Sequence, residues 1–196
     1  PVEEGSVGGG SGMNCYAYKG GSGTASRTIA YGEDRHVVGT FVQTNFGVRR
    51  ELTIAGVPVG TALLDDDPIS EHFSTPPGAG SVIAVVATDA PLLPDQCDAL
   101  ARRVTLGLAR TGTAGSHFSG DLFIALSVGN PGAFSRGVDT LFGKGYGSYD
   151  DVRFVPWGHL DPYFDAVVQA TEEAVLNSLL SNEEMIGFRG HRSLAL

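Results

Sequence analysis

Ser81 is the residue in this sequence whose surroundings best suit a nucleophile. It follows a run of small residues and prolines, Pro76-Pro77-Gly78-Ala79-Gly80, and it begins an apolar stretch that continues to Ala87. Because glycine at position 80 leaves its own carbonyl unobstructed, the Ser81 hydroxyl could attack that carbonyl and shift the acyl group from nitrogen to oxygen. Hydrolysis of the resulting ester would cut the chain between Gly80 and Ser81. The freed α-amine, with a pKa of about 8, would then act as a general base beside the hydroxyl.

Three other polar residues stand where they could assist such a nucleophile: Ser119, Asp121 and Asn45. Ser119 and Asp121 are separated by one residue, so their side chains point to the same face of an extended chain. A hydroxyl and a carboxylate aimed together can hold an ammonium group or relay a proton. Asn45 ends a predicted strand, where its amide could donate a hydrogen bond to an oxyanion. Taken singly, each of these residues, and Ser81 too, also suits an ordinary turn or strand end.

Other catalytic and ligand-binding classes find less support in the sequence. His117 has the same parity as Ser119 and Asp121, but no Gly-x-Ser-x-Gly motif accompanies it, so we discount a serine–histidine–aspartate triad. The glycine-rich stretch at 8–12 lacks the lysine of a phosphate-binding loop. The other histidines show no ligand spacing, and the two cysteines match no zinc pattern and are expected to be buried; these residues are His36, His72, His159, His191, Cys15 and Cys97. We therefore predict no metal and no organic cofactor.

Composition describes one acidic globular domain. The 196 residues carry a formal net charge of −9, which argues against nucleic acid as a partner and against a basic membrane-binding face. Hydrophobic residues make up 42% of the chain, enough for a sizeable core, but no apolar run reaches the roughly 18 residues of a membrane span. The chain begins at Pro1 without an initiator methionine, so we expect an N-terminal portion to precede it and leave the compartment open.

The elements that must position these residues change in character near the middle of the chain. In the first half, β-branched and aromatic residues divided by glycine turns predict strands at 13–19, 24–31, 37–45, 51–54 and 59–63. A polar, acidic and proline-bearing linker follows at 65–78. In the second half we expect a strand at 81–87 covered on both faces, a helix at 94–110, strands at 121–128 and 153–156, and a long helix capped by Asp161. This alternation indicates an α/β protein.

Six motifs, taken in order, resemble those of one known family. They are Ser-Val-Gly-Gly-Gly-Ser-Gly-Met at 6–13, Gly-Thr-Ala-Ser-Arg at 23–27, Val-Gln-Thr-Asn-Phe-Gly at 42–47, Ala-Thr-Asp-Ala-Pro-Leu at 87–92, Ser-Gly-Asp at 119–121 and Glu-Glu-Ala-Val-Leu-Asn at 172–177. The family is the L-aminopeptidase/D-esterase-amidase group, self-cleaving hydrolases with an N-terminal serine that include the β-peptidyl aminopeptidases. The resemblance covers nearly the whole chain.

The resemblance implies a fold, a cut and a set of roles. The fold would be an αββα four-layer sandwich, like that of the N-terminal-nucleophile hydrolases but with different connectivity. Residues 1–196 would form a single catalytic domain without its N-terminal portion, cut between Gly80 and Ser81 into the end of an α-chain, 1–80, and a β-chain, 81–196. Ser81 would be the nucleophile, Ser119 and Asp121 its polar partners, and Asn45 a donor to the oxyanion hole. Family members often assemble as tetramers of such α/β pairs.

The implied activity is removal of an N-terminal residue from small peptides, amides or esters that carry a free amine, through an acyl-enzyme on Ser81. Two departures from the family bear on this activity. The upstream part carries an acidic residue that grips the substrate amine, and Asp121 stands where some β-peptidyl aminopeptidases have glutamate. Two alternatives stay open: an acyltransferase related to ornithine acetyltransferase, and an inactive homologue that is never cut. Transfer to an added amine would identify the first, and an intact Gly80–Ser81 bond the second.

Overall fold

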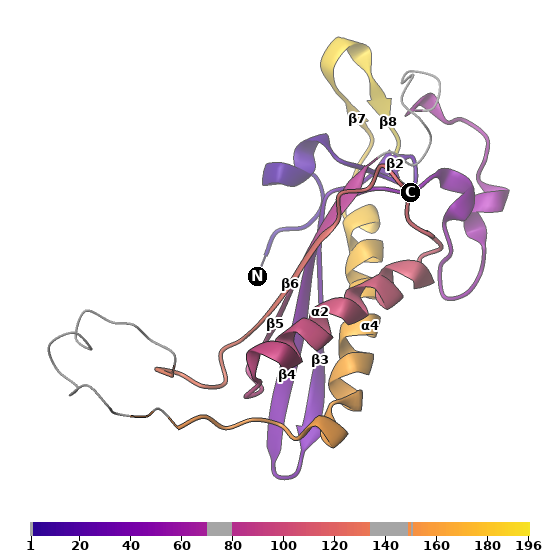
Figure 1. The fold of residues 1–196 in the computed structure, drawn as a ribbon. Coiled ribbons are helices and arrows are strands. Elements are labelled where there is room, and N and C mark those ends of the chain that lie inside the picture. The colour runs from indigo at the N-terminus through magenta and orange to yellow at the C-terminus, as the bar shows by residue number, and fades with distance from the viewer. Residues whose placement is uncertain (1, 70–79, 134–148, 150) are drawn as a thin grey trace, which may run out of the picture.

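A four-stranded sheet with two helices on one of its faces forms the centre of the structure, a computed structural model that describes residues 2–69, 80–133, 149 and 151–196. The strands, in their order across the sheet, are β3 (Ser22–Tyr31), β4 (Asp34–Asn45), β5 (Ser81–Thr88) and β6 (Leu122–Ser127). Strand β4 runs antiparallel to both of its neighbours, β3 and β5, and β6 is parallel to β5. Helices α2 (Pro94–Arg110) and α4 (Asp161–Leu180) pack against each other and against the sheet (Figure 1).

Two short hairpins and several 3₁₀ turns surround the sheet. β1 (Asn14–Cys15) pairs with β2 (Tyr18–Lys19), and β7 (Met185–Ile186) pairs with β8 (Arg192–Ser193). The 3₁₀ turns are η1 (Gly8–Gly12), η2 (Arg49–Glu51), η3 (Val59–Ala62), η4 (Trp157–His159) and η5 (Phe188–Gly190). Both hairpins lie at the same end of the molecule, where the N–H of Lys19 donates to the carbonyl of Leu194 at 2.6 Å (Figure 1).

The core lies between the sheet and the helices and follows from the alternation of side chains along the strands. In β5 every second residue from Val82 to Thr88 is buried on the face that the helices cover. Helix α2 presents its apolar residues at helical spacing toward this face. Helix α4 approaches β3 so closely that a Cβ at Gly23 would lie 2.0 Å from the carbonyl oxygen of Ala174. Glycine at position 23 therefore allows the helix to rest directly on the sheet.

The opposite face of the sheet is open in the described part of the chain. Ile83, Leu122 and Ile124 are 44%, 66% and 56% exposed, and Ile83 lies beside Leu122 in the register of β5 and β6. Within the described residues the strand at 81–87 is therefore covered on one face only, because these residues supply one sheet and one layer of helices. A sheet face with several large, exposed apolar side chains is normally covered by another layer of protein. A second sheet packed on it would give the four layers that the resemblance implies.

The main strands and both long helices are confirmed, but three of the predicted strands are wrong for local reasons. The strand expected at 13–19 is split into the β1–β2 hairpin, because Tyr16 and Ala17 adopt φ values of 52° and 57° and form its turn. The stretch expected as a strand at 51–54 begins at the last residue of the 3₁₀ turn η2, and the one expected at 59–63 is mostly the 3₁₀ turn η3. Here the Glu51 carboxylate accepts the N–H of Val48 at 3.2 Å and closes the first of these turns.

Two further expectations near the second helix also fail. Residues 153–156 form no strand, because the side chain of Asn130 replaces a neighbouring strand by bonding both the N–H and the carbonyl of Arg153, at 2.8 and 2.9 Å. Asp161 is the first residue of α4 and makes no capping bond. The N-cap position is held by Leu160, which directly follows turn η4. Most of the linker expected at 65–78 lies outside the described residues.

Two neighbouring core residues make the stability sensitive to alkaline pH. Cys15 and Tyr16 are fully buried, and burial raises the pKa of the Cys15 thiol to about 12 and also raises the pKa of Tyr16. The folded chain therefore keeps protons that the unfolded chain loses. As pH rises from 9 toward 12, the unfolded state binds fewer protons than the folded state, so the free energy of unfolding falls.

For Cys15 alone, we expect a loss of about 2 kcal/mol between roughly pH 9 and 11. Urea unfolding of the wild type and of Cys15→Ala across this range measures the effect. The alanine variant starts less stable at neutral pH, because a buried group has been removed, but its stability should fall less steeply. Parallel curves for the two proteins would contradict the assignment. Cys97 is buried and unpaired as well, so the expectation for both cysteines is confirmed.

Candidate active site

The candidate functional residues gather at one edge of the sheet. Asn45 ends β4 and Ser81 begins β5, and the two are register partners in the antiparallel pairing. Because β6 runs parallel to β5, the start of β6 reaches the same edge, and Ser119 and Asp121 come directly before it. The order of the strands thus brings together residues that are far apart in the sequence.

Ser81 contacts the loop that carries two of the other candidates. The backbone N–H of Gly120 donates to Ser81 Oγ at 2.9 Å. The N–H of Val82 donates to Asp121 Oδ1 at 3.0 Å, and the hydroxyl of Ser119 donates to the same carboxylate oxygen. The structure therefore places Ser81, Ser119 and Asp121 together, with the carboxylate reaching the nucleophile candidate through the backbone of the next residue.

Asn45 is oriented by a second backbone group. Its Oδ1 accepts the N–H of Asn14 at 3.1 Å, which fixes which end of the amide is the acceptor. The Nδ2 end is then the part of this side chain that can donate to an anion. Since Asn45 is the register partner of Ser81, such a donor lies on the strand next to the nucleophile candidate.

Gly80 meets the requirement for a small residue before Ser81. A Cβ at this position would lie 2.0 Å from the carbonyl oxygen of Asn45, closer than any side chain allows. The end of the strand therefore accepts only glycine at this position.

A cavity of about 280 Å³ opens beside this edge, between the segment after β4 and the loop before β6. Ser119 and Asp121 line it together with His117. The other lining residues include Phe46, Val48, Arg50, Glu51, Val82, Leu108 and Thr113. Sequence reasoning missed Arg50 and Glu51: Glu51 begins a stretch that was expected to be a strand, and Arg50 comes directly before it. The neighbouring Asn45-Phe46-Gly47 motif was the signal that could have pointed to them.

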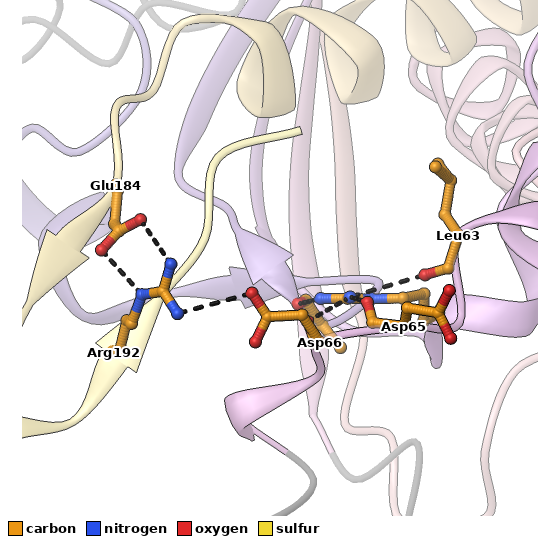
Figure 2. Close-up of polar contacts among 7 residues, drawn as sticks. Leu63, Asp65, Asp66, Glu184 and Arg192 are labelled. Atoms are coloured by element: carbon orange, nitrogen blue, oxygen red, sulfur yellow. Dashed lines mark hydrogen bonds and ion pairs between the residues drawn. The ribbon is translucent and has the colours of Figure 1, made fainter.

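Two arginines hold residues 63–66, where the expected linker begins. Arg49 is 4% exposed and donates to the carbonyl oxygens of Asp65 at 3.2 Å and Asp66 at 2.7 Å. Arg192 binds both carboxylate oxygens of Glu184, at 2.7 and 3.0 Å, and lies 3.4 Å from the carboxylate of Asp66 (Figure 2). The ion pair between Arg192 and Glu184 is exposed and contributes little stability. The carbonyl oxygens around the buried Arg49 accept hydrogen bonds from its guanidinium group, and they would lose this donor if Arg49 were replaced. Arg49 thus ties this segment to the turn that lines the cavity.

Among the described residues, no group of three histidine, cysteine, aspartate or glutamate side chains is arranged to hold a metal ion. In the same part of the chain, no helix combines the length and the apolar character needed to cross a membrane.

Comparisons with known proteins agree on one family. The model of peptidase family S58 matches residues 1–193. The β-peptidyl aminopeptidase BapA of Sphingosinicella microcystinivorans is 41% identical over 200 residues, which cover 97% of this chain and 48% of that protein. The BapA of Sphingosinicella xenopeptidilytica is 40% identical over 194 residues, covering 95% of this chain and 46% of the relative. The chain thus spans about half the length of the curated relatives that it matches.

Solved structures match over the whole chain as well. The L-aminopeptidase D-Ala-esterase/amidase from Ochrobactrum anthropi, described as a prototype of the serine aminopeptidases and a new variant of the Ntn hydrolase fold, has a TM-score of 0.86 and 41% identity over 100% of this chain and 50% of its own. A β-aminopeptidase from Burkholderia sp. gives a TM-score of 0.85 and 40% identity, covering 51% of its length. The predicted fold class, a variant of the N-terminal-nucleophile hydrolases, is therefore confirmed.

Proposed function

This chain belongs to peptidase family S58, and from that premise we propose that it forms the catalytic part of a serine aminopeptidase. Its substrates would be small peptides, amides or esters with a free amine, from which it releases the N-terminal residue. The observation that carries the proposal is the contact between Ser81 and the 119–121 loop, which gives a hydroxyl, a carboxylate and backbone N–H groups at one strand edge.

The first step in this proposal is self-cleavage. Ser81 Oγ attacks the carbonyl carbon of Gly80, the bond from that carbon to the Ser81 nitrogen breaks, and the Oγ proton passes to the nitrogen. Water then hydrolyses the ester, which leaves a carboxylate on Gly80 and restores the hydroxyl. The products are the end of an α-chain, 1–80, and a β-chain, 81–196, within one catalytic domain. The N–H of Gly120 supports the attack, because a donor to Oγ stabilises negative charge on that oxygen.

The second step is turnover. The new α-amine takes the proton from Ser81 Oγ, which attacks the substrate carbonyl, and the proton then goes to the departing amine. Water releases the acyl group in the same way. Asp121, held by Ser119, would attract the ammonium form of the Ser81 amine between the two proton transfers, and Asn45 Nδ2 would donate to the oxyanion. Assembly as a tetramer of α/β pairs stays a prediction from the family.

Intact mass spectrometry of the full-length protein, with N-terminal sequencing of any smaller fragment, tests the proposal. We expect a fragment that begins Ser-Val-Ile-Ala-Val, together with release of amine from amino-acid amides. An uncut chain without turnover would contradict the proposal and favour the inactive homologue. A cut chain that passes its acyl group to an added amine in preference to water would instead identify an acyltransferase.

A further inference from the structure

We propose that Lys19 is a positioning residue for this active site: its ammonium group holds the turn at residues 10–13 so that the N–H of Asn14 fixes the amide of Asn45 beside Ser81. The inference rests on the proposed function, because it assumes that the Asn45 amide serves the oxyanion. It adds a residue that lies outside the cavity and that no catalytic motif includes.

The surroundings of Lys19 are unusual for a lysine. The residue is 1% exposed, and Nζ donates to the carbonyl oxygens of Gly10 at 3.0 Å, Met13 at 2.7 Å and Gly20 at 2.7 Å. These three acceptors use all three protons of the ammonium group. In the part of the chain that the structure describes, no carboxylate lies within ion-pair distance of it.

A buried ammonium without a carboxylate is a costly way to stabilise a turn. Burial lowers the pKa of Lys19 to about 8, which reflects that cost. A serine or an asparagine could stabilise a single carbonyl more cheaply. Lysine offers three donors at the end of one long stem, and here they converge on carbonyls from two separate stretches of backbone. The arrangement therefore fixes the position of the turn relative to the hairpin, rather than merely closing the turn.

The held turn leads directly to the catalytic edge. The N–H of Met13 donates to Gly10 at 3.1 Å and its carbonyl accepts the N–H of Gly20 at 3.0 Å, so Lys19 binds both ends of a closed turn. Asn14 comes next and is the register partner of Lys19 across the β1–β2 hairpin. Its N–H donates to Asn45 Oδ1 at 3.1 Å, and Asn45 pairs with Ser81. A displacement of the turn would therefore be passed to the amide through one backbone hydrogen bond.

A double-mutant cycle in the full-length, fully cut protein tests the inference. Lys19→Met keeps most of the apolar stem and removes the donors, and it should lower kcat about 10-fold with KM within about twofold. Asn45→Ala should lower kcat roughly 10²-fold. Because Lys19 acts through Asn45, the double variant should turn over no more slowly than Asn45→Ala alone. Cys97→Ala, which removes a buried side chain on helix α2 away from this hairpin, should lower the melting temperature and leave kcat unchanged.

Each result has a defined meaning. A double variant that falls a further 10-fold below Asn45→Ala would overturn the inference, as would a Lys19→Met enzyme with wild-type kcat. If Asn45→Ala itself kept wild-type kcat, the role assigned to Asn45 would fail, and the positioning role would fail with it, although Ser81 chemistry would stand. If Lys19→Met does not accumulate as folded protein, Lys19→Gln, which keeps two donors on a shorter stem, should give the same non-additive loss of kcat.

Discussion

Replacing Ser81 by alanine is expected to leave the chain uncut and to abolish turnover. The variant lacks both the oxygen that attacks Gly80 and the oxygen that would carry the acyl group. Loss of a catalytic serine typically removes several orders of magnitude of rate, so we expect kcat to fall by roughly 10⁴-fold or more. The fold should persist, because Ser81 is a half-buried residue at a strand end and alanine fits that position.

Mass spectrometry and an amide-hydrolysis assay on the same preparation measure this prediction. Ser26→Ala is a matched control, since Ser26 is an exposed serine on β3 and should be cut and active like the wild type. A Ser81→Ala protein that is still cut between positions 80 and 81, or that still turns over, would remove Ser81 from the mechanism.

Replacing Asp121 by asparagine should have the second largest effect. The side chain is nearly unchanged in size and its oxygen can still accept the N–H of Val82, so folding should be unaffected. What disappears is the negative charge that the proposal uses to hold the ammonium form of the Ser81 amine. We expect kcat to fall by roughly 10³-fold, within the range that acid–base groups contribute. Asp121→Glu keeps the charge but changes the reach, so its activity should lie between the two.

Steady-state kinetics on fully cut protein separate this effect from slow processing. Asp98→Asn on helix α2 is a suitable control, because it removes one exposed carboxylate from the same acidic protein away from the site. If Asp121→Asn kept kcat within about threefold of the wild type, the carboxylate would be structural, and its bond to Val82 would be its main role.

The grouping of Asn45, Ser81 and Asp121 into one site could be predicted from the family resemblance, and the order of the strands explains it. Each residue stands at the end of an apolar stretch, and strand ends meet at a sheet edge. The parity of Ser119 and Asp121 then placed both side chains together. The family suggested by the motifs is confirmed by the match over residues 1–193.

The roles of Lys19 and Arg49 could not be predicted, because each side chain binds carbonyl oxygens of turns that no local pattern places nearby. Every residue has a backbone carbonyl acceptor, so the sequence does not indicate which of them will accept a hydrogen bond from a buried lysine or arginine. The same limit explains the errors at 51–54 and 59–63. Their composition suits a strand, but within the described residues neither stretch pairs with a strand of the sheet, and the backbone closes turns instead.

The pairing of β4 with β5 has a consequence for how a cut protein would behave. Eight register pairs, from Val38 with Thr88 to Asn45 with Ser81, would join two separate polypeptides through the middle of one sheet. Helix α4 of the second fragment also packs on β3 and β4 of the first. Neither fragment would retain a complete core alone, so dilution should not separate them, and two bands would appear only under denaturing conditions. Synthesis as a single chain would then solve an assembly problem, since both halves of the sheet are joined before either has to find the other.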